Sequence, residues 1–288
     1  MTTRTWLITG ASSGFGRSMT EQLLERGDRV AATARTPERL ADLAEKYGDQ
    51  LWTAALDVTD TAALRAVVEK AFAELGHIDV IVSNAGRGLF GAAEEITDQD
   101  IEGQIATNLV APVQLTRAVL PHLRAQGGGR IVAVSSMGGQ IATPGGSLYH
   151  ASKWGAEGFF ESVMPEVAPF GVEITLVEPG IAQTGFGRSL AVASALHVYA
   201  STPVGRVRQY IEAPGGVTEN APGDPQKIAA AIIASVDVKP ASRRLTLGSD
   251  AYEMVRAALI GRLGELEAAR ELASSTDVDG FQRPEQTS

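Results

Sequence analysis

The chain has 288 residues, 44% hydrophobic and 20% charged, which is the composition of an ordinary globular protein. The net charge of -9 argues against a nucleic-acid partner, and the absence of cysteine excludes disulfides, thiolate catalysis and cysteine zinc sites. Four scattered histidines lack the paired spacing of a metal site, so we expect no metal. No apolar run approaches the roughly 20 residues of a membrane span. The chain enters a strand-like segment at Thr5 without room for a signal peptide, which indicates a cytoplasmic protein.

Short runs rich in Val and Ile alternate with amphipathic stretches along the chain. We predict strands over 5–9, 29–34, 51–58, 79–84, 129–136, 172–179 and 243–248. We predict helices near 15–26, 37–46, 61–75, 98–125, 149–168, 225–236 and 250–273, with Thr36-Pro37 and Thr97 with Asp100 as N-terminal caps. This alternation predicts an α/β fold: a doubly wound, Rossmann-like parallel sheet of about seven strands, in a three-layer α/β/α arrangement.

Neither an internal repeat nor a linker divides the chain, so we expect one domain over 1–288. Two segments depart from the alternation. Residues 185–222, which contain three prolines, read as a substrate-loop insertion, because loops this long in compact domains are often lids. The polar tail 274–288 has a composition typical of disorder.

A glycine loop, Thr9 to Gly16, follows the first strand and opens the first helix. Glycines there allow a tight turn and a close approach of backbone to a pyrophosphate, which the helix N-terminus attracts. A structural turn rich in small residues is the alternative for the loop taken alone. The residues that we expect at the phosphates are Gly10, Ser12, Ser13, Gly14, Phe15 and Gly16.

The second strand ends in Ala34-Arg35-Thr36, where a fold that prefers NAD usually carries an acid for the ribose 2′-hydroxyl. Arg35 could instead bind a 2′-phosphate, so we expect NADP(H) in preference to NAD(H). The alternative is a solvated loop charge. Asp57 and Val58 follow the third strand and could contact the adenine, although Asp57 could equally cap the loop.

Tyr149 and Lys153 stand four residues apart, and Ser136 lies thirteen residues before the tyrosine. Four residues is about one helical turn, so the phenol and the ammonium share a helix face. A cation beside a phenol lowers its pKa, which would make Tyr149 a usable proton donor and acceptor. Ser136 would supply a hydroxyl to the reacting oxygen.

Several ordered motifs carry a resemblance to a known family. They are TGASSGFG (9–16), LDVTD (56–60), SNAG (83–86), TNL (107–109), SS (135–136), YHASK (149–153) and EPGIAQT (178–184). Over residues 5–185 the chain resembles the short-chain dehydrogenase/reductase family in its single-domain form. The pattern is similar to its hydroxysteroid and retinol dehydrogenase-like members. Ser83 departs from the family, which more often has asparagine there.

The resemblance implies an NADP(H)-dependent oxidoreductase that interconverts a ketone or aldehyde and its alcohol. Tyr149 would be the general acid/base, Lys153 would bind the nicotinamide ribose, Ser136 would bind the substrate oxygen and Asn108 would position a water. The alternative for Asn108 is a helix-interior amide bonded to backbone. Ser135 is excluded by spacing, and His150 receives no role. The cofactor would also meet Asn84, Ala85, Gly86, Tyr149, Lys153, Pro179, Gly180, Ile181 and Thr184.

The expected substrate contacts are largely apolar, which indicates a hydrophobic substrate. They are Met137 and Phe186 beside Ser136 and Tyr149, with Leu89, Phe90, Ile141, Leu190, Leu196 and Tyr199 as further candidates, about half of which we expect to be core residues. The resemblance also implies a homodimer or homotetramer built through the helices near 98–125 and 149–168. The alternatives are a non-catalytic NADP(H)-sensing protein, an acyl-carrier-protein ketoreductase, and a nucleotide-sugar epimerase or methyltransferase.

Overall fold

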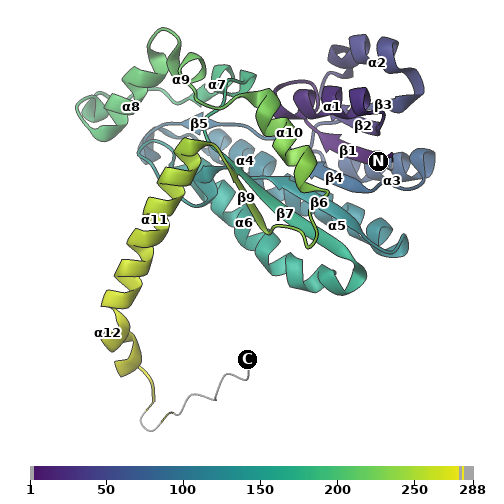
Figure 1. Ribbon diagram of the computed structural model, residues 1–288. Coiled ribbons are helices and arrows are strands. Elements are labelled where there is room, and N and C mark those ends of the chain that lie inside the picture. Colours follow the sequence, from purple (N-terminus) through teal and green to yellow (C-terminus); the bar gives the residue numbers. More distant parts are fainter. Residues whose placement is uncertain (1–2, 279–280, 282–288) are drawn as a thin grey trace.

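A computed structural model describes residues 3–278 and 281 of the chain. Seven parallel strands form its central sheet in the order β3-β2-β1-β4-β6-β7-β9, with helices on both faces (Figure 1). The strands are β1 (Thr5–Thr9), β2 (Arg29–Ala34), β3 (Leu51–Ala55), β4 (Val80–Ser83), β6 (Gly129–Val134), β7 (Val172–Pro179) and β9 (Arg244–Leu247). The predicted doubly wound, Rossmann-like fold is confirmed.

The helices pack in two layers. They are α1 (Gly14–Arg26), α2 (Ala41–Tyr47), α3 (Thr61–Leu75), α4 (Asp98–Ile105), α5 (Ala111–Ala125), α6 (Ser147–Val167), α7 (Gly185–Arg188), α8 (Pro203–Glu212), α9 (Gly216–Glu219), α10 (Pro225–Ser235), α11 (Ser249–Ala268) and α12 (Arg270–Ser275). One core joins the sheet to α1, α2 and α10, and the other joins it to α3, α5 and α6. Alternate side chains of β1 enter opposite cores, Trp6 and Ile8 the first and Leu7 the second.

The order of the strands reverses at β1, which pairs with β2 on one side and with β4 on the other. In open α/β sheets ligands bind outside the carboxyl ends of the strands at such a switch point. The glycine loop after β1 and the SNAG segment after β4 therefore meet where a nucleotide is expected.

Local capping explains the start of some helices. Asp60 accepts hydrogen bonds from the amides of Ala62 and Ala63 at the start of α3, and Thr97 and Asp100 form the predicted capping box of α4. Thr36 makes no capping hydrogen bond, so that predicted cap is wrong; Pro37 opens a 3₁₀ turn (Pro37–Leu40) before α2.

Several predicted elements also differ in extent from the structure. Strand β3 ends at Ala55 rather than at residue 58, because the chain turns there and Asp57 bonds to Thr59. The helix predicted over 98–125 is interrupted by a π-helical segment, Ala106–Val110, between α4 and α5. Such segments often occur at functional sites, and this one contains Asn108.

The predicted insertion 185–222 contains regular structure: α7, β8, α8 and α9. Strand β8 (Ala191–Val192) pairs in parallel with β5 (Leu89–Phe90) in a separate small sheet, which was not predicted. Two-residue strands leave no periodicity in a sequence. The pairing ties the insertion to the segment that follows β4.

A buried ion pair makes a second connection to the insertion. Arg208 on α8 contacts Glu95 at 2.5 Å and donates a hydrogen bond to the carbonyl oxygen of Ala193. Burial alone would raise the pKa of Glu95, but amide hydrogen bonds from Leu196 and Ala92, together with Arg208, hold it below its ordinary value. The insertion is thus fastened by a charged carboxylate.

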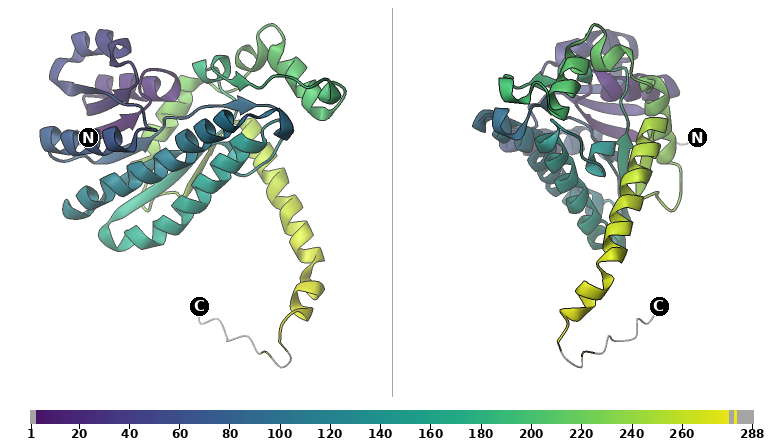
Figure 2. Two further views of the ribbon diagram at one scale, coloured as in Figure 1. Left: turned by 180° about the vertical axis from the view of Figure 1, so that it is seen from behind. Right: turned by 90° about the vertical axis from the view of Figure 1, so that its left-hand side faces the viewer.

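The C-terminal helices extend away from the sheet. Figure 2 shows α11 and α12 pointing out of the body, and only Ala251 and Val255 of α11 are buried. Of the predicted tail 274–288, Ser274 and Ser275 belong to α12, whereas 279–280 and 282–288 lie outside the described residues. Across the described part of the chain, every helix is too short or too polar to span a membrane.

We predict that Arg208→Met loosens the insertion, because removal of one partner strands the buried charge of Glu95. The insertion should lose about 3–5 kcal/mol of stability against local unfolding. The loss would be measured as faster hydrogen exchange and faster proteolysis within 185–222. Arg206→Met, an exposed arginine on the same helix, is the matched control.

The ion pair should also respond to pH. The pKa of Glu95 is lowered in the folded chain, so its stabilisation exists above the ordinary pKa of a glutamate and disappears as the pH falls. Two results would contradict this account. One is equal protection of residues 185–222 from hydrogen exchange in the two arginine variants, and the other is protection that does not change as the pH falls.

Candidate active site

The glycine loop is built by positions that cannot carry a side chain. Gly10 and Gly14 have φ values of +67° and +54°, in the left-handed region that favours glycine. A Cβ at Gly16 would lie 2.4 Å from the carbonyl oxygen of Gly10. The loop therefore folds back onto the first turn of α1, as a phosphate cradle requires.

Asn84 braces this loop from β4. Its side-chain amide donates to the carbonyl oxygens of Thr9 (2.8 Å) and Gly10 (3.2 Å), while the Thr9 hydroxyl accepts from the amides of Asn84 and Ala85. The amide of Asn84 is thus committed to backbone, so its part in a nucleotide site is to hold the loop. Ala85 and Gly86 continue past it, and Gly86 lies beside Asn108 and Lys153.

The glycine loop carries two hydroxyls, those of Ser12 and Ser13. Ser13 is the N-cap residue of α1 and makes no capping hydrogen bond, so its hydroxyl and the first amides of the helix are free of that contact. Ser12 is half-buried beside it, and Phe15 packs partly against the core. These features fit a dinucleotide phosphate.

The predicted residues at the ends of β2 and β3 are Arg35, Asp57 and Val58, of which the last two make contacts within the chain. Arg35 is exposed and close enough to Asp57 for its charge to act there. Hydrogen bonds from Thr59 hold the pKa of Asp57 below its ordinary value, and the Asp57 carboxylate caps its own turn. Val58 packs partly against the core. The structure therefore shows Asp57 capping its own loop, which was the alternative to a contact with the adenine.

The segment after β7 closes the same edge. A Cβ at Gly180, next to Pro179 at the strand end, would lie 2.2 Å from Oδ1 of Asp250, whose other oxygen accepts from the amide of Ile181 (2.8 Å). Thr184 caps α7 by accepting from the amide of Phe186 and lies near Gly14. The structure thus brings Thr184 to the glycine loop.

Ser136, Tyr149 and Lys153 meet at the end of β6. The Ser136 hydroxyl accepts from the amide of Gly138 (3.0 Å) and lies near enough to the phenol of Tyr149 to lower its pKa. Lys153 is buried; its Nζ donates to the carbonyl oxygen of Val134 (3.0 Å) and lies 5.9 Å from the centre of the Tyr149 ring. The predicted trio is therefore assembled in space.

The expected electrostatic effect on Tyr149 is not observed. Burial raises the pKa of the Tyr149 phenol above its ordinary value, and the nearby Ser136 hydroxyl offsets this only in part. The expectation that Lys153 lowers this pKa is wrong for this structure, in which the ammonium bonds to Val134. Burial lowers the pKa of Lys153 itself to about 8, against an opposing effect of Glu157.

Asn108 lies within the π-helical segment and is buried. Its carbonyl oxygen accepts from the amide of Arg87 (2.9 Å), and its amide donates to the carbonyl oxygen of Arg87 (2.9 Å) and to the hydroxyl of Ser152 (3.3 Å). The side chain therefore bonds to backbone, as the alternative held. A small cavity lined in part by Ser83, Asn108, Ser135 and Lys153 adjoins it.

Two neighbours of the trio have structural contacts. Ser135 donates to Glu157 (2.7 Å), away from Tyr149, which agrees with its exclusion by spacing. The ring nitrogens of His150 lie 2.9 Å from the carbonyl oxygen of Gly138 and 3.1 Å from the amide nitrogen of Thr143. His150 thus braces the turn after Ser136.

The apolar candidates include both core and surface positions. Phe186 is 6.2 Å from the Tyr149 ring between centroids, and Phe186 and Leu190 cover Gly88. Met137 follows Ser136 and is half-buried. The other candidates are the core residues Leu89, Phe90 and Ile141, the exposed Leu196 and the half-buried Tyr199.

Sequence reasoning missed three residues that shape this site: Thr9, Glu157 and Asp250. Thr9 was visible as the first residue of the glycine loop, and Glu157 as the acid one turn beyond Lys153. Asp250 is distant in sequence and offers no local signal. Within residues 3–278 and 281, no cluster of three or more potential metal ligands occurs.

Comparisons with known proteins agree with this geometry. The family model described as short chain dehydrogenase matches residues 4–193. An oxidoreductase named BOA17 from Botryotinia fuckeliana is 39% identical over 253 residues, which are 87% of this chain and 91% of that protein. A 3-ketodihydrosphingosine reductase from Bacteroides thetaiotaomicron is 39% identical over 180 residues, 62% of this chain and 64% of its own length.

A 3-oxoacyl-[acyl-carrier-protein] reductase from Escherichia coli is 33% identical over 201 residues, covering 70% of this chain and 82% of its own. The solved structure of a short-chain dehydrogenase from Streptomyces avermitilis superposes with a TM-score of 0.89 at 38% identity, over 96% of this chain and 100% of that one. The closed form of a serine dehydrogenase complexed with NADP+ superposes with a TM-score of 0.71 at 28% identity, over 84% and 94%. The chain therefore belongs to the short-chain dehydrogenase/reductase family of oxidoreductases.

Proposed function

We propose that the protein is an NADP(H)-dependent oxidoreductase that interconverts a hydrophobic ketone or aldehyde and its alcohol. The observation that carries this proposal is the meeting of Ser136, Tyr149 and Lys153 beside the glycine loop. The loop, the free Ser13 hydroxyl and the amides of α1 would hold the cofactor phosphates. When bound, NADPH supplies the hydride.

The side chains of the trio divide the remaining work. Tyr149 donates its proton to the carbonyl oxygen as the carbonyl carbon accepts the hydride, which gives the alcohol. The phenol is protonated near neutral pH, the form that carbonyl reduction needs, and burial favours that neutral form further. The hydroxyl of Ser136 holds the same oxygen, and Lys153 places a positive charge beside the phenol. The cavity beside Asn108 offers room for the water of a proton relay.

The hydrophobic nature of the substrate rests on the apolar side chains around Tyr149, among which Phe186 stands nearest. The name of the Bacteroides relative, a 3-ketodihydrosphingosine reductase, is consistent with it. The second candidate is reduction of the 3-oxo group of an acyl chain carried as a thioester on an acyl-carrier protein, which the Escherichia coli relative favours. The net charge of -9 disfavours an acidic carrier protein.

Tyr149→Phe should abolish turnover while NADPH still binds, because the phenyl ring keeps its shape and loses the proton. The expected loss in kcat is at least about 10²-fold. The assay is a panel of ketones, alcohols and a 3-oxoacyl thioester, with NADPH and NADH, alongside NADPH fluorescence titration. Turnover that survives the substitution would overturn the mechanism, and a preference for the thioester would select the second candidate.

Arg35→Ala should raise KM for NADPH and leave KM for NADH near its wild-type value. At the end of β2 the Arg35 guanidinium could bind a 2′-phosphate, and hydrogen bonds to a charged group contribute about 1.5–3 kcal/mol. Arg39→Ala, an exposed arginine in the following turn, is the control. An NADH preference in the wild type, or equal effects in both variants, would refute the role of Arg35.

We also propose that the protein forms a homodimer or homotetramer through α4, α5 and α6. These helices and the π-helical segment expose the apolar side chains of Ile101, Val110 and Trp154. Val110→Glu should lower the molar mass measured by light scattering after size exclusion. Val238→Glu, an exposed valine far from these helices in the sequence, is the control. A monomeric wild type, or an unchanged mass, would contradict the proposal.

A further inference from the structure

Glu157 is a buried carboxylate on α6, one turn beyond Lys153, and only 3% of it is exposed. A buried charge is costly unless it is fully paired. Its Oε1 accepts from the hydroxyl of Ser135 (2.7 Å), and its Oε2 accepts from the side-chain amide of Gln140 and from Arg244 (3.0 Å). Two of these donors lie directly before and after residues 136–139.

Residues 136–139 form a turn between these two donors, and the turn lies directly against the Glu157 carboxylate. A Cβ at Gly139 would be 2.0 Å from Oε1 of Glu157 and 2.8 Å from the hydroxyl oxygen of Ser135. Only glycine fits there, so the position of the turn and that of the carboxylate are set together.

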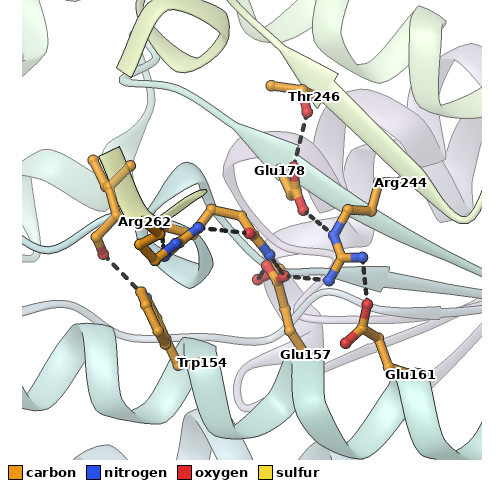
Figure 3. Close-up of polar contacts among 10 residues, drawn as sticks. Trp154, Glu157, Glu161, Glu178, Arg244, Thr246 and Arg262 are labelled. Atoms are coloured by element: carbon orange, nitrogen blue, oxygen red, sulfur yellow. Dashed lines mark hydrogen bonds and ion pairs between the residues drawn. The ribbon is translucent and has the colours of Figure 1, made fainter. Parts of the chain in front are cut away.

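A network of charges holds the carboxylate from behind (Figure 3). Arg244 on β9 also contacts Glu161 (2.5 Å) and Glu178 on β7 (2.8 Å), and Glu178 accepts from the hydroxyl of Thr246 (2.8 Å). Burial and the charge of Glu157 raise the pKa of Glu178. Burial would lower the pKa of Arg244, but its hydrogen bonds to Glu161 and Glu157 raise it, so the guanidinium stays charged.

The far end of the turn is held by α11. Arg262 donates to the carbonyl oxygen of Gln140 (2.7 Å) and stacks over the Trp154 ring at 4.9 Å (Figure 3). The charged and titratable groups around Glu157 and its turn are thus Lys153, Glu161 and His150 on α6, Glu178 on β7, Arg244 on β9 and Arg262 on α11.

We propose that Glu157 is a positioning residue of the reductase site, whose carboxylate fixes the turn that carries Ser136 and Met137. The inference rests on the proposed function, because it assigns Glu157 a part in the work of Ser136. Glu157 holds the residue before Ser136 and the residue that ends the turn, so the Ser136 hydroxyl is fixed against Tyr149 without contact between Glu157 and the reacting atoms.

Its charge has a second effect at the same site. Glu157 raises the pKa of Lys153 against the larger effect of burial, which brings that pKa down to about 8. Without the negative charge, the ammonium would lose its proton at lower pH. A merely structural residue would have no such effect on the pH profile.

The test is Glu157→Gln in the full chain, assayed with NADPH and an active ketone from the panel. The amide keeps the shape but has one acceptor oxygen instead of two and carries no charge, so it should hold Ser135 and Gln140 less tightly and the turn should shift. We expect kcat to fall by about 10–100-fold, since small misplacements of a reacting group cost that much. The wild-type kcat/KM should decline above about pH 8, and this decline should move to lower pH in the variant.

Glu161→Gln is the matched control, because Glu161 pairs with the same Arg244 one turn further along α6 and does not contact the turn. It should leave kcat and the pH profile near their wild-type values. Ser135→Ala is the second variant if Glu157→Gln fails to fold. It should lower kcat and leave the alkaline decline in place, because the charge of Glu157 remains.

The inference is overturned if folded Glu157→Gln keeps the wild-type kcat and its kcat/KM declines at the same alkaline pH as the wild type. It is also overturned if Glu161→Gln loses as much kcat as Glu157→Gln. If Glu157→Gln does not fold, wild-type kcat in Ser135→Ala has the same meaning. The proposed function fails separately, through turnover that survives Tyr149→Phe.

Discussion

The nucleotide end of this molecule depends on one close backbone approach. The first turn of α1 lies so near the start of the glycine loop that a single carbon on Gly16 would meet the carbonyl oxygen of Gly10 at 2.4 Å. This contact directs the helix N-terminus at the end of β1, and Asn84 then fastens the loop to β4 across the switch point. The glycine loop and the end of β4 are consequently joined, and the proposed proton-transfer residues lie beside them.

The side of the site that holds Ser136, Tyr149 and Lys153 has the opposite character, because it brings ionisable groups into buried or half-buried places. Burial raises the pKa of Tyr149 and lowers that of Lys153, so both side chains favour their neutral forms more than they would in water. Two groups with opposed shifts at one location are typical of acid–base sites. A nearby buried carboxylate, Glu157, restores part of the charge of Lys153 and is itself held by Arg244.

Much of the fold and the core of the site were predictable because their signals are local. Val- and Ile-rich runs between helical patterns predicted every strand of the central sheet, and the glycine loop and the Tyr149–Lys153 spacing depend on neighbours in the chain. The two-residue strands β5 and β8 and the π-helical turn around Asn108 leave no periodicity. The prediction that the pKa of Tyr149 is lowered failed for a different reason. Residue spacing reveals a neighbouring cation, but it reveals neither the depth of burial nor the acceptor that the cation prefers.

Gly139 and Glu157 stand eighteen positions apart, yet they occupy one space, because the glycine leaves the volume that the carboxylate fills. A related protein with a side chain at position 139 has no room for a glutamate in this place, and one without the glutamate has no need of the glycine. The two positions should therefore change together as such proteins diverge. The pair of residues at these two positions would show which members of the family hold the turn that carries Ser136 with a buried carboxylate and which hold it by other contacts.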